Sequence, residues 1–370
     1  MPTVRKKRLS FALVFWLAAA AIIFGLDLFF QSNARAAEFY SRHVYAVLRL
    51  PFVYVHRALP FSVTEIAVIL LVLLAIPCWV YWTVKFIRNK AKGRFVLQSA
   101  RFIVIAACIF YSLFMLMHGF NYSRQSLFTS LELPRREYTR EELFEVTAWL
   151  VTEVNTARES IRTDADGHFV FKDEETTHEA MQRAAIAYDL AAETTDLINR
   201  HQSLPKPVML SHRWSYTGVT GMYFPIFVES NVNRDIAPDE MMFTTLHELA
   251  HAQGFAREDE ANYWAYYTGT RHPDEDYRYA SYLSTLIYFN NAAYTADREL
   301  WSQLYEQLDD GAKLDLARRN LYWDQFRGPV KEASRQVNDT FLKVNHIEDG
   351  TKSYGRMMDL VMAEYFVNVQ

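Results

Sequence analysis

The sequence predicts a mainly α-helical protein, in which three N-terminal transmembrane helices precede a helical soluble domain with a small antiparallel β element. Three observations lead to this fold class. The first 120 residues contain three apolar stretches that are each long enough to cross a bilayer. Most of the remaining chain has helical periodicity. The region 207–233 differs, because it is rich in β-forming residues and interrupted by glycine.

The apolar stretches cover residues of about 9–30, 63–86 and 95–120. The first follows a basic run at residues 5–8 and is longer than the apolar core of a typical signal peptide, so we expect an uncleaved helix. Residues 1–120 are therefore predicted to form a membrane domain, and the lipid bilayer is the first expected partner.

The segment 31–62, between the first two apolar stretches, has aromatic and aliphatic residues at helical spacing. It also carries Arg35, Arg42, Arg49 and Arg57. This pattern is typical of a helix that lies on the membrane interface, where arginine side chains extend to the lipid headgroups. We therefore expect an interfacial loop at 31–62.

Basic residues also predict the orientation of the chain. The N-terminal run and the basic loop at 85–94 belong on the cytoplasmic side under the positive-inside rule. Three crossings then place residues 121–370, the predicted soluble domain, outside the cytoplasm. The four arginines of segment 31–62 oppose this orientation, because they would lie outside the cytoplasm as well.

Composition limits the function classes. The chain is 51% apolar with a net charge of −4, and its Lys and Arg residues are scattered, so we expect no nucleic acid partner. Both cysteines, Cys78 and Cys108, lie in apolar stretches. The soluble part therefore has no disulfide, and its cysteine content does not identify its compartment.

The strongest chemical signal is the run from His247 to His251, which reads His-Glu-Leu-Ala-His. Pro238 marks the start of a helix and Gly254 its end. Residues four apart share one face of a helix, so both imidazoles can bind a single metal ion. Glu248 is then positioned to act on water bound to that metal. An amphipathic helix with two surface histidines is the plain alternative.

A third ligand is expected downstream. A catalytic zinc site typically has three protein ligands and leaves a fourth position for water. Gly254 lets the chain reverse, which brings the following acidic segment back to the histidines. Glu258 is the preferred ligand and Glu260 the alternative, while Asn262 can hydrogen-bond a ligand histidine. For either glutamate alone, the alternative is a solvated first turn of a helix.

The region 207–233 contains two expected strands, at 208–210 and 221–228. Pro225 within the second indicates an edge strand. A free edge just before the histidine helix suits an extended peptide, which can add to it by backbone hydrogen bonds, whereas an edge covered by a loop is the alternative. The candidates for substrate or transition-state contacts are Tyr223, His212 and Tyr354.

The run 247–251, followed by Glu258 and Asn262, resembles the gluzincin metallopeptidases, in which a His-Glu-x-x-His helix precedes a Glu-x-x-x-Asp helix. The resemblance implies a zincin-like soluble domain, with the two histidines and Glu258 as zinc ligands and Glu248 as general base. Asn262 stands where the family usually has Asp. The gap between the two motifs is also short, which keeps Glu260 as the alternative ligand.

Over almost its whole length the chain is also similar to a family of bacterial integral-membrane proteins called domain of unknown function 3810. This resemblance implies a multi-pass protein of the bacterial cell membrane. The matching blocks are 60–66, 218–225, 231–233, 247–262 and 342–355.

Together these observations predict a membrane-anchored zinc-dependent hydrolase, a metallopeptidase that binds one Zn²⁺ and uses zinc-bound water with Glu248 as general base. Its expected substrate is a peptide or protein. The alternative is a non-catalytic membrane protein with a structural zinc site, which presents a binding domain outside the cytoplasm. Glu248 favours the hydrolase, because a structural site needs no base beside its ligands.

Overall fold

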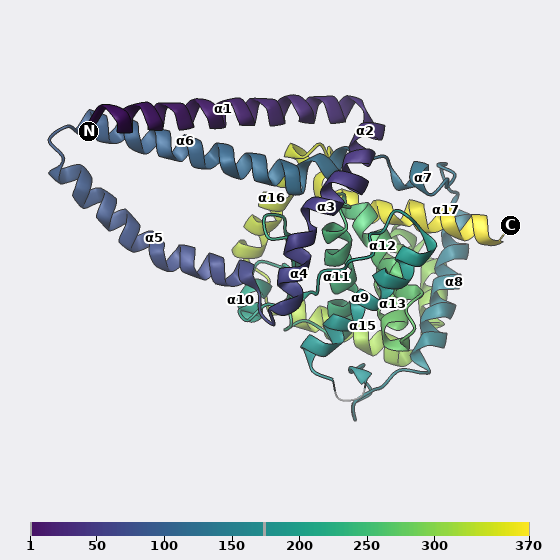
Figure 1. The fold of residues 1–370 in the computed structure, drawn as a ribbon. Coiled ribbons are helices and arrows are strands. Elements are labelled where there is room, and N and C mark those ends of the chain that lie inside the picture. The colour runs from purple at the N-terminus through teal and green to yellow at the C-terminus, as the bar shows by residue number, and fades with distance from the viewer. Residues whose placement is uncertain (1, 173–174, 370) are drawn as a thin grey trace.

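The protein is described by a computed structural model that covers residues 2–172 and 175–369. Helices dominate the structure, and its one sheet has three short strands. The structure has three helices that are long and apolar enough to cross a membrane among the described residues. They extend from one side of a helical body (Figure 1). The predicted fold class, mainly α-helical with a small β element and three N-terminal apolar helices, is confirmed.

The three long helices each contain a stretch of 22 or 26 residues that is apolar enough to cross a membrane. The first packs along the third, whereas the second diverges from both (Figure 1). Trp82 and Phe86 of the second helix contact Phe95 of the third, close to the loop that joins them. These helices are α1 (Pro2–Ser32), α5 (Val63–Arg88) and α6 (Lys92–Met117).

The segment between α1 and α5 is helical, as expected, and it packs against the helical body. Arg49 is fully buried and donates to the backbone carbonyls of Ala252 and His201 in the helical body. Arg42 and Arg57 also donate to backbone carbonyls there. The expectation that arginines of this segment reach headgroups is wrong for Arg49, because its buried guanidinium donates to protein carbonyls. For the other arginines it stays a prediction. The elements are α2 (Ala34–Phe39), the π-helical η1 (Tyr40–Tyr45), α3 (Ala46–Leu48) and α4 (Leu50–Ala58).

The helical body is organised around α11 (Pro238–Ala252), which contacts α9, α12 and α13 and both longer strands. Nearly all of α11 is buried, because neighbours cover every side of it. The other elements are η2 (Gly119–Ser123), α7 (Leu127–Ser130), α8 (Arg140–Arg158), α9 (Thr177–Thr194), α10 (Ser211–Ser215), α12 (Glu258–Thr270), α13 (Glu275–Ala296), α14 (Arg298–Glu306), α15 (Asp310–Asp324), α16 (Pro329–Val344), η4 (Gly350–Arg356) and α17 (Met357–Val369).

Local sequence explains where several of these helices begin. Thr139 and Thr176 start α8 and α9 through reciprocal capping boxes with Glu142 and Glu179. Caps of this kind typically contribute about 1 kcal/mol. The central helix starts at Pro238. Proline fits the first position because a backbone N–H there would have no partner within the helix. Acidic residues follow in the first turn, where the helix dipole favours negative charge.

The sheet is mixed rather than purely antiparallel. The central strand β3 pairs with β2 in antiparallel and with β1 in parallel orientation. The expected strand at 208–210 is wrong, because the chain pairs at 206–207 and then turns. The other expected strand is an edge strand, as predicted, but it ends before Pro225, which has no N–H for the ladder. The strands are β1 (Lys206–Pro207), β2 (Gly221–Phe224) and β3 (Glu229–Val232).

Two buried carboxylates join the body to the first turn of α5. Glu229 of β3 accepts the N–H groups of Val63 and Thr64 at 2.8 and 2.7 Å. In return, Glu65 of α5 accepts both N–H groups of residues 209–210 at 2.8 Å. A carboxylate at a helix N-terminus is favoured by the helix dipole and by charge-assisted hydrogen bonds. These contacts therefore determine where α5 leaves the body.

We predict that Glu229→Gln destabilises the detergent-solubilised protein by about 2–3 kcal/mol at pH 7. Burial raises the pKa of Glu229, but hydrogen bonds from His56 and from residues 63–64 lower it to about 2, against an ordinary value of 4.5. Its contribution is therefore complete above pH 4.5 and is lost as the pH falls to about 2. Chemical unfolding at several pH values measures both effects.

The matched control is Glu332→Gln, since Glu332 lies in an exposed ion pair with Arg335. We expect this change to alter the free energy of unfolding by less than about 0.5 kcal/mol. A Glu229→Gln variant that unfolds like the parent at pH 7 would contradict the assigned role.

Candidate metal centre

The candidate centre is built on α11, the turn after it and the start of α12. His247 and His251 lie one turn apart on α11. Gly254 has a φ angle of +92°, and a Cβ at this position would lie 3.0 Å from the Tyr45 ring. Both the left-handed conformation and the close packing require glycine. The turn reverses the chain and places Glu258, the first residue of α12, beside the two histidines.

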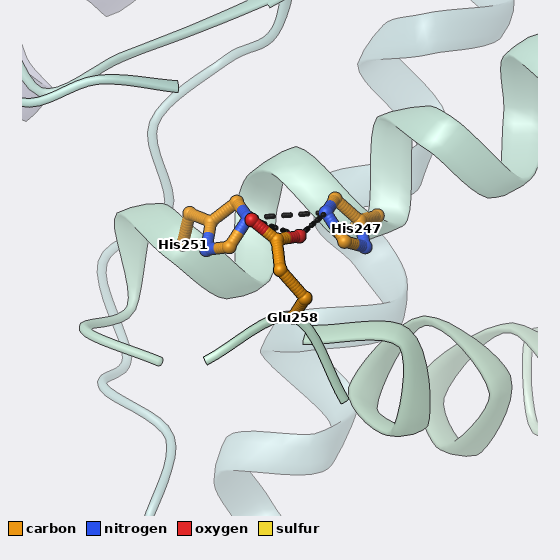
Figure 2. A group of neighbouring side chains, drawn as sticks. All are labelled: His247, His251 and Glu258. Carbon is orange, nitrogen blue, oxygen red and sulfur yellow. Dashed lines mark hydrogen bonds and ion pairs between the residues drawn. The ribbon is translucent and has the colours of Figure 1, made fainter. Parts of the chain in front are cut away.

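The side chains of His247, His251 and Glu258 point toward one another (Figure 2). The Nε2 atoms of His247 and His251 are 3.0 Å apart. Glu258 Oε2 lies 3.2 Å from His247 Nε2 and 3.5 Å from His251 Nε2. Within residues 2–172 and 175–369, this is the one group of three His, Cys, Asp or Glu side chains whose ligand atoms all lie within 4.8 Å of one another. The arrangement is compact enough to hold one ion.

The second ring nitrogen of each histidine faces a carbonyl oxygen. His247 Nδ1 lies 2.7 Å from Asn262 Oδ1, and His251 Nδ1 lies 2.7 Å from the Phe255 carbonyl. A carbonyl oxygen only accepts, so each Nδ1 carries a hydrogen, and in the neutral rings each Nε2 has its lone pair free. The Asn262 amide is itself held, since its Nδ2 donates to the Tyr354 carbonyl at 3.3 Å. Histidines that bind metals normally have such partners.

The electrostatics of His247, His251 and Glu258 favour a positive charge between the three side chains. Burial alone would lower the pKa of His251, but the Glu258 carboxylate raises it to about 9. Burial would raise the pKa of Glu258, but the two histidines hold it well below its ordinary value. The donor set of two imidazoles and one carboxylate is also a common ligand set for a divalent cation.

Glu248 lies beside this cluster without joining it. Its side chain is buried, and its Oε2 has no hydrogen-bond partner among the described residues. Burial also raises the pKa of its carboxyl group. A Cβ added to Gly221 of β2 would lie 2.5 Å from Glu248 Oε1 and 2.6 Å from Thr244 Cγ2, so only glycine lets the strand lie directly against the carboxylate. A buried carboxylate with free hydrogen-bonding capacity is typical of a catalytic base.

Glu260, the alternative third ligand, points elsewhere. It accepts the N–H of Leu127 at 3.0 Å and forms an ion pair with Arg257. Together with Asp259 it lines a separate cavity of about 1170 Å³. Two steps along a helix turn a side chain by about 200°, so Glu258 and Glu260 face nearly opposite directions. The geometry therefore favours Glu258 as the ligand.

Two of the candidate contact residues lie near the histidines. The Tyr354 ring is nearly parallel to that of His247, at 11° with ring centroids 6.5 Å apart. The Tyr223 ring lies 6.2 Å from that of His251, but its hydroxyl is 2.9 Å from the Tyr45 hydroxyl. Tyr354 therefore forms one wall of the centre, while Tyr223 connects it to the segment between α1 and α5.

The expected contact residue His212 lies away from the cluster, whereas His118 lies near it. His212 is exposed on α10, where it pairs with Asp235, and none of its contacts in the described chain reaches the cluster. His118, which no sequence pattern indicated, directly follows α6, and its ring lies 6.0 Å from that of His251. Burial lowers the pKa of His118 to about 3, so it is neutral at pH 7. No spacing rule links it to the 247–251 run.

Comparison with known proteins identifies a family. No curated protein and no solved structure matches this chain. The family model described as "protein of unknown function (DUF3810)" matches residues 40–362. The matched range includes α5, α6 and every residue of the candidate centre, so the resemblance noted from the sequence blocks is confirmed. The chain therefore belongs to the DUF3810 family.

Proposed function

We propose that this protein is a membrane-anchored zinc-dependent hydrolase, specifically a metallopeptidase whose body lies outside the cytoplasm. The observation that carries the proposal is the convergence of His247, His251 and Glu258 beside Glu248, whose Oε2 has no hydrogen-bond partner among the described residues. The basic loop at 85–94 supports the orientation.

The ligand set supports zinc. Two imidazole nitrogens and one carboxylate oxygen are typical of catalytic zinc sites, which leave a fourth position open. No fourth His, Cys, Asp or Glu of the described residues belongs to the cluster. A structural site would normally fill that position with protein, so the set favours the hydrolase over a purely structural role. When bound, zinc supplies a Lewis acid that polarises a carbonyl group and activates water.

Glu248 is the proposed general base. Its Oε2 is free to accept a hydrogen bond, and its place on α11 next to His247 puts it beside the cluster. It takes a proton from the attacking water and passes it to the leaving nitrogen. The side chains around it are buried, which limits competition from bulk water.

The edge strand β2 supports a peptide substrate. β2 lies at the edge of the sheet, and its Gly221 lies against Glu248. An extended peptide that pairs with this edge through backbone hydrogen bonds would have its carbonyl groups next to the base. This placement favours peptide bonds over other amides and esters.

We predict that Glu248→Gln retains one zinc ion per chain and lowers peptide hydrolysis by about 10²–10⁴-fold, because the amide keeps the shape of the side chain but cannot accept the proton. Elemental analysis of the purified protein and cleavage of a fluorogenic peptide library measure the two effects. The control is Glu299→Gln, at an exposed position of α14, which should retain both properties. Undiminished turnover by the Glu248→Gln variant would exclude Glu248 as the base.

Zinc stoichiometry also separates the two candidate ligands. We expect Glu258→Gln to lose most of the bound zinc and Glu260→Gln to retain it, because only Glu258 lies with the histidines. Elemental analysis of both variants, after dialysis against a weak chelator, tests this. Loss of zinc from Glu260→Gln alone would show that the third ligand is misassigned.

A further prediction concerns Asn262, which orients His247. Asn262→Ala removes the acceptor of the Nδ1 hydrogen, and we expect zinc affinity to fall by about 10–100-fold. Tyr288→Phe is the matched control, since it removes only a hydroxyl that Asn262 contacts through Nδ2 at 3.2 Å. Competition with a chromogenic chelator measures both affinities. Equal affinities for Asn262→Ala and the parent would mean that this hydrogen bond does not support the ligand.

A further inference from the structure

Helix α16 has an apolar stripe that is largely exposed. Val330, Val337, Phe341 and Val344 are 54, 70, 41 and 71% exposed. Because a helix turns by about 100° per residue, steps of 7, 11 and 14 residues return to nearly the same direction. The four side chains therefore form one continuous stripe along the helix.

The other faces of α16 have different surroundings. Leu342 is buried against the body, and Asn338 donates to the Tyr354 hydroxyl at 3.3 Å. The polar face carries ion pairs between neighbouring turns, of which Lys343 with Asp339 is one. α16 is therefore amphipathic, with one face on the protein, one charged face and one exposed apolar face.

Two contacts place the C-terminal end of α16 at the level where the long helices meet the body. The Phe341 ring packs edge-on against Phe114, with ring centroids 6.0 Å apart, and Phe114 lies one turn before the last residue of α6. His346, just after α16, lies 2.9 Å from the side chain of Gln31 near the end of α1. The stripe thus continues the exposed apolar surface of α6, to which Phe110 belongs.

A second exposed apolar site lies at the base of α5. Met209 and Leu210 are exposed, and Glu65 in the first turn of α5 holds their backbone N–H groups. In Figure 1, α16 and α10 both lie on the side of the body from which α5 and α6 extend. Exposed apolar side chains therefore occur on the body where it faces the membrane.

We propose that α16 is an interfacial helix whose apolar stripe lies in the headgroup and acyl boundary of the bilayer. Lipid covers the stripe, because the stripe is continuous with a surface of α6 that itself faces acyl chains. The charged face of α16 lies beside the stripe, where its side chains can reach headgroups. Asn338 and Tyr354 connect this helix to His247, so the same immersion would hold one wall of the candidate centre at the membrane surface. The proposal depends neither on zinc nor on hydrolysis.

The test uses the full chain with Cys78→Ala and Cys108→Ala, reconstituted in phosphatidylcholine nanodiscs. Single cysteines at Val337 and Val344 report on the stripe, and Gln336→Cys is the control, since Gln336 is exposed on the polar face one residue away. Each cysteine carries an environment-sensitive fluorophore. Quenching is measured with aqueous iodide and, separately, with a nitroxide attached to the lipid acyl chains.

We expect the probes of Val337→Cys and Val344→Cys to be quenched by the lipid nitroxide and to have a several-fold lower iodide quenching constant than Gln336→Cys. Two positions are used so that one misfolded variant does not decide the result. Equal iodide quenching at all three positions would overturn the proposal. Protection from both quenchers would overturn it too, because it would show that protein, such as a second copy of the chain, covers the stripe.

Discussion

The turn after α11 is the constraint on which the candidate centre and its link to the membrane helices both depend. Arg124 donates to the Gly254 carbonyl at 3.0 Å, and the same guanidinium pairs with Glu38 through two hydrogen bonds of 3.0 and 2.9 Å. It also lies over the Phe255 ring, 4.2 Å from the centroid. A buried guanidinium needs acceptors for its N–H groups, so opening the turn would leave Nη1 of Arg124 without the Gly254 carbonyl. Glu258 stays beside the histidines because this turn is held closed.

The segment between α1 and α5 and the end of α6 are therefore part of the support of the candidate centre. Glu38 belongs to α2, in the segment that joins two of the long helices, and Tyr45 of the same segment donates to the Ala252 carbonyl at the end of α11. The ring of His118, at the end of α6, lies 6.0 Å from that of His251. A division of the chain at residue 121 into a membrane part and a soluble part misses these contacts, because residues 34–62 pack as a layer of the body.

Several titratable side chains lie together in the centre. Elsewhere in the body, Arg319 forms a buried ion pair with Asp239 at the start of α11, and Asp239 Oδ1 has no hydrogen-bond partner among the described residues. In the centre, two imidazoles share one carboxylate, and the neighbouring Glu248 retains a free oxygen. Glu248 Oε2 is one of several buried polar atoms that have no partner among the described residues, and it lies beside the two histidines and Glu258. A buried polar atom without a partner calls for an explanation, and an ion and a substrate at this centre are the explanation that we propose.

The sequence by itself determined the three apolar spans, the start and end of α11 and the shared face of His247 and His251, because length, composition, caps and helical spacing are local properties. It left Glu258 and Glu260 as alternatives, since both lie within the same short segment. Only the tertiary structure separated them, through the ion pair that Arg257 forms with Glu260. The burial of Arg49, the parallel pairing of β1 and the approach of His118 were also decided there. Each depends on contacts between residues far apart in the chain, and no periodicity in the sequence records such contacts.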